Sequence, residues 1–97
     1  MPEREEVLSV LREYKRDYFE KYNIIAIGIF GSMARGEAGA DSDVDICVKT
    51  KTPDPYSLVH IREDIENRLR VPVDIIRIRE KMNPDLRQRI ERDAIYV

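Results

Sequence analysis

A seven-residue apolar run, IIAIGIF at residues 24–30, leads directly into Gly31 and Ser32. Its isoleucines are β-branched and favour extended backbone, and a short continuous apolar run is typical of a buried strand. The next segment, residues 31–42, contains three glycines and predicts a turn, with room for a short helical turn at residues 33–35. The pattern therefore predicts a buried strand that ends in a glycine-rich turn.

Helical patterns flank this unit. Apolar residues recur at helical spacing over residues 3–22 and again over residues 56–70. Asn83 followed by Pro84 is typical of an N-cap and a first-turn proline, so we expect a last helix to begin there.

Two further segments, residues 44–49 and 71–78, are rich in valine and isoleucine and predict a second and a third strand. The connection between the first two strands is too short for a full crossover helix, which favours antiparallel pairing. We expect one α/β (α+β) domain over residues 1–97, with a small mixed three-stranded sheet flanked by helices that cover one side.

Composition excludes several classes of protein. Seventeen Lys and Arg against nineteen Asp and Glu leave a net charge of -2, which disfavours a long nucleic acid as partner. No apolar run reaches the roughly 18 residues of a membrane span, and the N-terminus does not resemble a signal peptide. One cysteine, Cys47, fits a reducing cytoplasm. With His60 as the single histidine, any metal must be held mainly by carboxylates.

Acidic residues gather around the second strand. Asp43 and Asp45 are two apart in an extended pattern, so they leave the same face about 6.5 Å apart. Two carboxylates about 6 Å apart repel by roughly 2.8 kcal/mol at an effective dielectric of 20 and by about 0.7 kcal/mol in water. Asp74 interrupts the third apolar strand, where a charge is costly unless it is paired or binds metal. Three carboxylates without Cys or His ligands favour Mg²⁺ or Mn²⁺, if the two strands are neighbours.

The turn after the first strand offers a phosphate site. Backbone N–H groups of Gly31 and Ser32 would point outward at a strand-to-helix turn, and the Ser32 hydroxyl adds a donor. Arg35, one turn later, can bring a positive charge to a polyphosphate or pair with a neighbouring acid.

Three better-known phosphate or metal motifs do not fit. A Walker A loop requires lysine where Glu37 stands, and an EF-hand requires glycine where Ile46 stands. The dinucleotide pattern Gly-x-Gly-x-x-Gly is absent. What remains is Gly31-Ser32, ten residues, then Asp43-Val44-Asp45.

This spacing, within GSMARGEAGADSDVDICV, resembles the signature of the polymerase-β-like nucleotidyltransferases, and especially of their minimal (MNT) branch. The resemblance implies a nucleotidyltransferase fold. It implies that Asp43, Asp45 and Asp74 are catalytic and hold two Mg²⁺ ions, with Mn²⁺ as the alternative metal. Gly31, Ser32 and Arg35 would contact the nucleotide, ATP or another NTP.

The resemblance also implies a reaction and a partner. Members of this family move a nucleoside monophosphate from an NTP to a hydroxyl and release pyrophosphate. Some act as antitoxins that adenylylate a HEPN-domain toxin, so we expect such a protein acceptor and an assembly with it or with further copies. Two alternatives stay open, namely a non-catalytic module that masks a toxin, and a transferase acting on RNA 3′ ends or small molecules.

Overall fold

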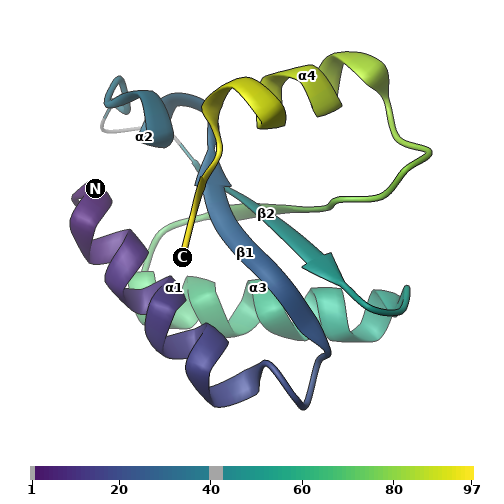
Figure 1. The fold of residues 1–97 in the computed structure, drawn as a ribbon. Helices are drawn as coiled ribbons and strands as arrows, with labels where there is room; N and C mark the ends of the chain where they lie inside the picture. The colour runs from purple at the N-terminus through teal and green to yellow at the C-terminus, as the bar shows by residue number, and fades with distance from the viewer. Residues whose placement is uncertain (1, 40–42) are drawn as a thin grey trace.

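The computed structural model describes residues 2–39 and 43–97, in which helices and strands alternate (Figure 1). Within these residues the helices are α1 (Arg4–Tyr18), α2 (Gly31–Arg35), α3 (Pro55–Leu69) and α4 (Pro84–Asp93). The strands are β1 (Ile24–Phe30), β2 (Val44–Thr50), β3 (Val73–Arg77) and β4 (Ile95–Tyr96). Each of the three predicted strands and each predicted helix is present, with bounds that shift by a few residues.

The strands form one mixed sheet in the order β3-β2-β1-β4. β1 and β2 pair antiparallel, which confirms the prediction from their short connection. β2 and β3 pair in parallel, because α3 supplies the crossover that a parallel pair requires. This places the beginnings of β2 and β3 side by side, at the end of the sheet where β1 finishes.

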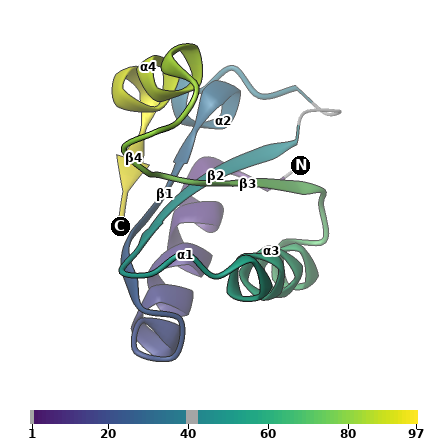
Figure 2. The ribbon, with the colours of Figure 1, turned by 90° about the vertical axis from the view of Figure 1, so that its right-hand side faces the viewer.

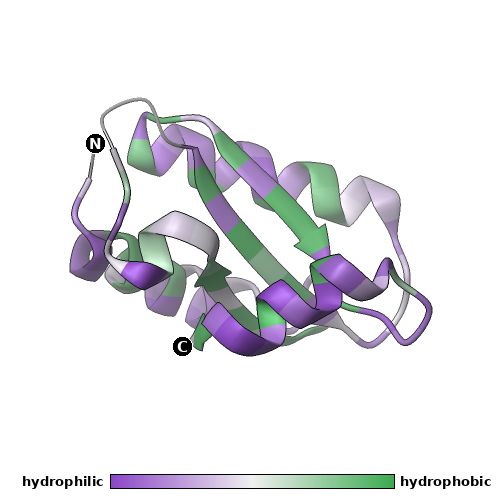
Figure 3. Ribbon diagram, turned by 90° about the horizontal axis from the view of Figure 1, so that it is seen from above, coloured by the Kyte–Doolittle hydropathy of each residue, from purple (hydrophilic) through white to green (hydrophobic). Residues whose placement is uncertain are grey.

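Helices cover both faces of the sheet (Figure 2). α1 and α3 cover one face, where the larger core packs; among its fully buried members are Val7, Leu11, Ile27, Ile29, Val44, Ile46, Val48, Ile61 and Ile65. α4 covers part of the other face, where Phe30, Cys47 and Ile90 form a smaller core. Seen from above, the helix that leads to the C-terminus lies across the strands and is mostly hydrophilic on its outer side (Figure 3). The rest of that second face is left for the site described below.

The expectation of a three-stranded sheet covered on one side is wrong in two respects. β4 adds a fourth strand, which pairs antiparallel with β1 at Gly28 and Ile29. A Cβ atom on Gly28 would overlap the backbone of β4 at Ile95, so the glycine is what allows this close approach. A two-residue strand is too short to show a period of two in the sequence. The second error follows from α4, which returns over the face opposite α1 and α3.

Local signals account for the ends of several helices. The Asn83 side chain accepts hydrogen bonds from the backbone N–H groups of Asp85 and Leu86, with Pro84 in the first turn, as predicted. α2 ends after one turn because Gly36 adopts a left-handed conformation, φ 75°. Among the described residues, no helix combines the length and the apolar character that crossing a bilayer requires.

Candidate active site

The parallel pairing of β2 with β3 brings two of the predicted carboxylates together. Asp45 and Asp74 are direct register partners, so their side chains leave the same face of the sheet from adjacent strands. Asp43 lies one residue before β2 and is exposed, while Asp45 is half-buried and Asp74 is exposed on the outermost strand. Asp45 and Asp74 therefore lie side by side at the open end of the face that α4 only partly covers, and Asp43 is close enough to act on the charge of Asp45.

The electrostatics of Asp45 reflect this crowding. Burial raises the pKa of the Asp45 carboxyl above its ordinary value, and the negative charges of Asp74 and Asp43 raise this pKa further. Two cations, Arg89 and Arg35, act in the opposite direction. The arginines of the site thus offset only part of its negative charge. A bound cation would reduce the remaining repulsion between the carboxylates.

The glycine-rich turn packs directly on this carboxylate. Gly31 has φ 72°, in the left-handed region, and a Cβ atom there would overlap Oδ2 of Asp45. Any other residue would be strained in backbone and would displace the carboxylate. Ser32 follows in the first turn of α2 and is half-buried. The structure therefore joins the Gly31-Ser32 turn and Asp45, which the sequence separates by more than ten residues, into one site.

Arg35 ends α2 and is held by two carboxylates. Its Nε donates to Oε2 of Glu37 at 2.9 Å, and its Nη1 donates to Oδ2 of Asp93 at 2.7 Å. The carbonyl of Ala34 accepts a hydrogen bond from Nη1 of Arg4, so α1 and α4 both hold the end of this short helix. The sequence left two hypotheses for Arg35, a contact to a polyphosphate and a pair with a neighbouring acid. These contacts are compatible with both, since Arg35 pairs with acids and also lies close enough to Asp45 to lower the pKa of that carboxyl.

Sequence reasoning missed Arg89 and Asp93. Both lie on α4, where Arg89 faces the charge of Asp45 and Asp93 binds Arg35. Charged residues make up 37% of the chain, and a helical pattern alone does not distinguish a charged residue that faces a site from one that faces water. The sequence feature that could have pointed to these two residues is that the last predicted helix begins soon after the strand that carries Asp74.

The donor set fits a hard divalent cation. Asp43, Asp45 and Asp74 offer carboxylate oxygens, and the repulsion between the register partners Asp45 and Asp74 is what such a cation would remove. In the described residues, no three acidic, histidine or cysteine side chains are yet gathered closely enough to ligate one ion. The Asp45–Asp74 pair is therefore the part of the site that the fold builds in advance.

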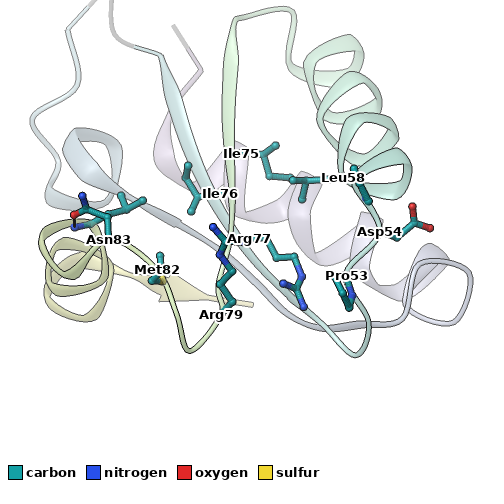
Figure 4. A pocket seen from close by; sticks show the side chains of 11 residues that line it. Pro53, Asp54, Leu58, Ile75, Ile76, Arg77, Arg79, Met82 and Asn83 are labelled. Atoms are coloured by element: carbon teal, nitrogen blue, oxygen red, sulfur yellow. Dashed lines mark hydrogen bonds between the residues drawn. The ribbon is translucent and has the colours of Figure 1, made fainter.

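A separate cavity of about 440 Å³ lies beside the outer edge of β3, between α3 and α4 (Figure 4). Leu58 and Ile75 line one side of it, Met82 and Leu86 another, and Arg77 and Arg79 reach into it. None of the three predicted carboxylates lines it. The cavity begins within one or two residues of Asp74 along β3, so it adjoins the site without containing its acids.

The fold and the site together define a nucleotidyltransferase of the polymerase β type. Residues 13–97 match the family described as Polymerase beta, Nucleotidyltransferase, and the chain belongs to this family. Members of this superfamily typically depend on a metal ion. The resemblance drawn from Gly31-Ser32 and Asp43-Val44-Asp45 is thereby confirmed, as is the nucleotidyltransferase fold.

Particular relatives are similar over nearly the whole chain. The chain is 37% identical over 93 residues to MJ0128 of Methanocaldococcus jannaschii, assigned as a protein adenylyltransferase, and the match covers 95% of both chains. It is 33% identical over 94 residues to the protein adenylyltransferase MntA of Thermococcus cleftensis, covering 96% of this chain and 94% of that one. A solved structure assigned to the minimal nucleotidyltransferases superimposes with TM-score 0.76 at 32% identity, covering 97% and 95%.

Proposed function

We propose that this chain transfers AMP from ATP to a hydroxyl group of a protein acceptor, and that the acceptor is a HEPN-domain toxin which the chain neutralises. The observation that carries the proposal is the register pairing of Asp45 with Asp74 beside the Gly31-Ser32 turn. Two relatives similar over about 95% of the chain bear the name of protein adenylyltransferases. A more distant structure with the same fold is an MNT antitoxin in complex with a tri-AMPylated HEPN toxin of Shewanella oneidensis.

In this proposal the three acids and the turn have separate tasks. Asp43, Asp45 and Asp74 would hold two Mg²⁺ ions, or Mn²⁺, and these ions would supply positive charge that favours in-line displacement at phosphorus. The backbone N–H groups at Gly31 and Ser32, the Ser32 hydroxyl and the Arg35 guanidinium hold the terminal phosphates. Because the Gly31 turn packs on Asp45, phosphates held by the turn lie next to the acids.

The reaction is a substitution at the α-phosphorus. The acceptor oxygen forms the new bond to this phosphorus, the bond to the bridging oxygen of the β-phosphate breaks, and pyrophosphate leaves. The acceptor proton passes to a carboxylate oxygen of Asp74. Asp74 suits this role because it is exposed on the outermost strand, where a hydroxyl presented by another protein can reach it. We place the reaction in the cytoplasm, where ATP and the reduced thiol of Cys47 are both expected.

The test is incubation with Mg²⁺, ATP and a HEPN-domain toxin, followed by intact-mass measurement of both proteins. We expect the toxin to gain the mass of one or more AMP groups, and the gain to disappear with EDTA or in Asp43→Asn/Asp45→Asn. Asp17→Asn, an acid on α1 away from the site, is the matched control and should retain activity.

Other outcomes separate the alternatives. If the double variant still neutralises the toxin fully, the chain is a masking module and the enzymatic proposal is wrong. If labelled NTP enters tRNA but never a protein, the acceptor is an RNA 3′ end.

A further inference from the structure

The last residue of α4, Asp93, accepts three side-chain hydrogen bonds from two arginines. Its Oδ2 accepts from Nη1 of Arg35 at 2.7 Å and from Nη2 of Arg92 at 3.1 Å, and its Oδ1 accepts from Nε of Arg92 at 2.9 Å. The Asp93 side chain is only 4% exposed. Both arginines hold the pKa of Asp93 below its ordinary value, so the carboxylate is charged whenever the site works.

One of these two arginines belongs to the site. Arg35 ends the five-residue helix that begins at Gly31, and its charge acts on Asp45. Arg92 is the neighbour of Asp93 on α4, and its side chain is 63% exposed. The pair with Arg35 spans 58 positions of the sequence and joins α2 to α4. Asp93 therefore bridges the candidate phosphate turn and the helix that covers the opposite side of the site.

The hydrogen bonds of Arg35 leave part of its guanidinium available. An arginine side chain has five N–H donors in a fixed plane. Nε of Arg35 donates to Glu37 and Nη1 donates to Asp93, while Nη2 donates to no acceptor within the described part of the chain. Because two nitrogen atoms of the Arg35 guanidinium are fixed, the third nitrogen atom, Nη2, points in one direction. The side chain has therefore lost rotamer freedom before a ligand binds, which lowers the entropy cost of binding.

We propose that Asp93 is a positioning residue, which holds Arg35 at the end of α2 so that the N–H groups of its Nη2 meet the nucleotide triphosphate. This inference rests on the proposed function, because it assumes that Arg35 contacts the nucleotide. Asp93 itself touches no substrate in this arrangement and acts through Arg35. Glu37, the other acid on Arg35, is 65% exposed and free to move away, so Asp93 is the anchor of the pair.

The test compares the affinity for AMP-PNP with Mg²⁺, measured by calorimetry, in the wild type, Asp93→Asn, Arg35→Ala and the double variant. We expect Asp93→Asn to weaken binding about 3- to 10-fold, the cost of ordering one long side chain on binding. Asp93→Asn should cause no further loss once Arg35 is alanine, and Asp93→Glu should restore most of the affinity. Arg92→Gln, which removes the other partner of Asp93, is the matched control and should bind as the wild type does.

Thermal unfolding of each variant separates positioning from a structural role. An Asp93→Asn protein with a lower Tm but unchanged affinity overturns the inference, as does an equal loss in the Arg35→Ala background. Tighter binding by Asp93→Asn would also overturn it, because Asp93 would then compete with phosphate for Arg35. A wild type that binds no nucleotide would overturn the proposed function itself, whereas normal wild-type binding with an unaffected Asp93→Asn variant overturns this inference alone.

Discussion

Replacing Asp45 by asparagine should make the metal-free protein more stable while it abolishes the transfer reaction. Asp45 and Asp74 are register partners on strands that lie about 4.8 Å apart, so their carboxylates are about 5 Å apart. Two charges at this separation repel by about 3.3 kcal/mol at an effective dielectric of 20 and by about 0.8 kcal/mol in water. Asp45 is half-buried, Asp74 is exposed, and Arg89 offsets part of the repulsion. We therefore expect a gain of about 1–2 kcal/mol.

The stability difference between the wild type and Asp45→Asn depends on pH with a defined sign. Burial and the neighbouring acids raise the pKa of Asp45 in the folded state above the ordinary 3.8. The folded protein therefore holds this proton more tightly than the unfolded chain, and the Asp45 contribution to stability falls as the pH rises through the raised pKa. Asparagine has no proton to lose. The stability advantage of Asp45→Asn should thus be small in acid and reach its full size near neutral pH.

Urea unfolding in EDTA, at several pH values, measures the free energy of unfolding of both proteins. The same titration with Mg²⁺ should stabilise the wild type and leave Asp45→Asn unchanged, because only the wild type retains the paired carboxylates. Asp17→Asn controls for the loss of one negative charge elsewhere. If Asp45→Asn is no more stable than the wild type in EDTA at neutral pH, the carboxylates do not repel as described and the argument for a built-in cation site fails.

Three further predictions concern single residues. Gly31→Ala should destabilise the protein by about 1–3 kcal/mol in urea unfolding and abolish AMP transfer. The reason is that φ 72° strains alanine and that the alanine Cβ would overlap the carboxylate of Asp45. Wild-type transfer by this variant would show that the close packing is dispensable. Asn83→Ala should cost about 1 kcal/mol through loss of the α4 N-cap while transfer persists; unchanged stability would mean that water satisfies the freed N–H groups equally well. Burial raises the pKa of Cys47 to about 11, so iodoacetamide at pH 8 should label the native protein slowly and the urea-unfolded protein fast, as followed by mass spectrometry; rapid native labelling would contradict the burial of this thiol.

Many features of the candidate site could be predicted from the sequence because they depend on residues that are close together in the chain. The side-chain period of two in a strand predicts that Asp43 and Asp45 share a face. The last helix begins where Asn83-Pro84 predicts. The Gly31-Ser32 turn follows from an apolar run that stops at a glycine. Asp74 was a candidate because a charge within an apolar strand requires a reason. Each of these features depends on residues that are only a few positions apart, and these can be read directly from the sequence.

Other features depend on contacts between distant parts of the chain, and no local period encodes them. The parallel register that sets Asp74 opposite Asp45 forms where α3 connects β2 to β3 and packs against β3. The fourth strand exists because Gly28 lets the last residues approach β1, and Arg35 meets Asp93 because α4 folds back over the sheet. Residue types and spacing thus specified which groups are able to react, whereas the packing of helices on the sheet brought those groups within reach of one another.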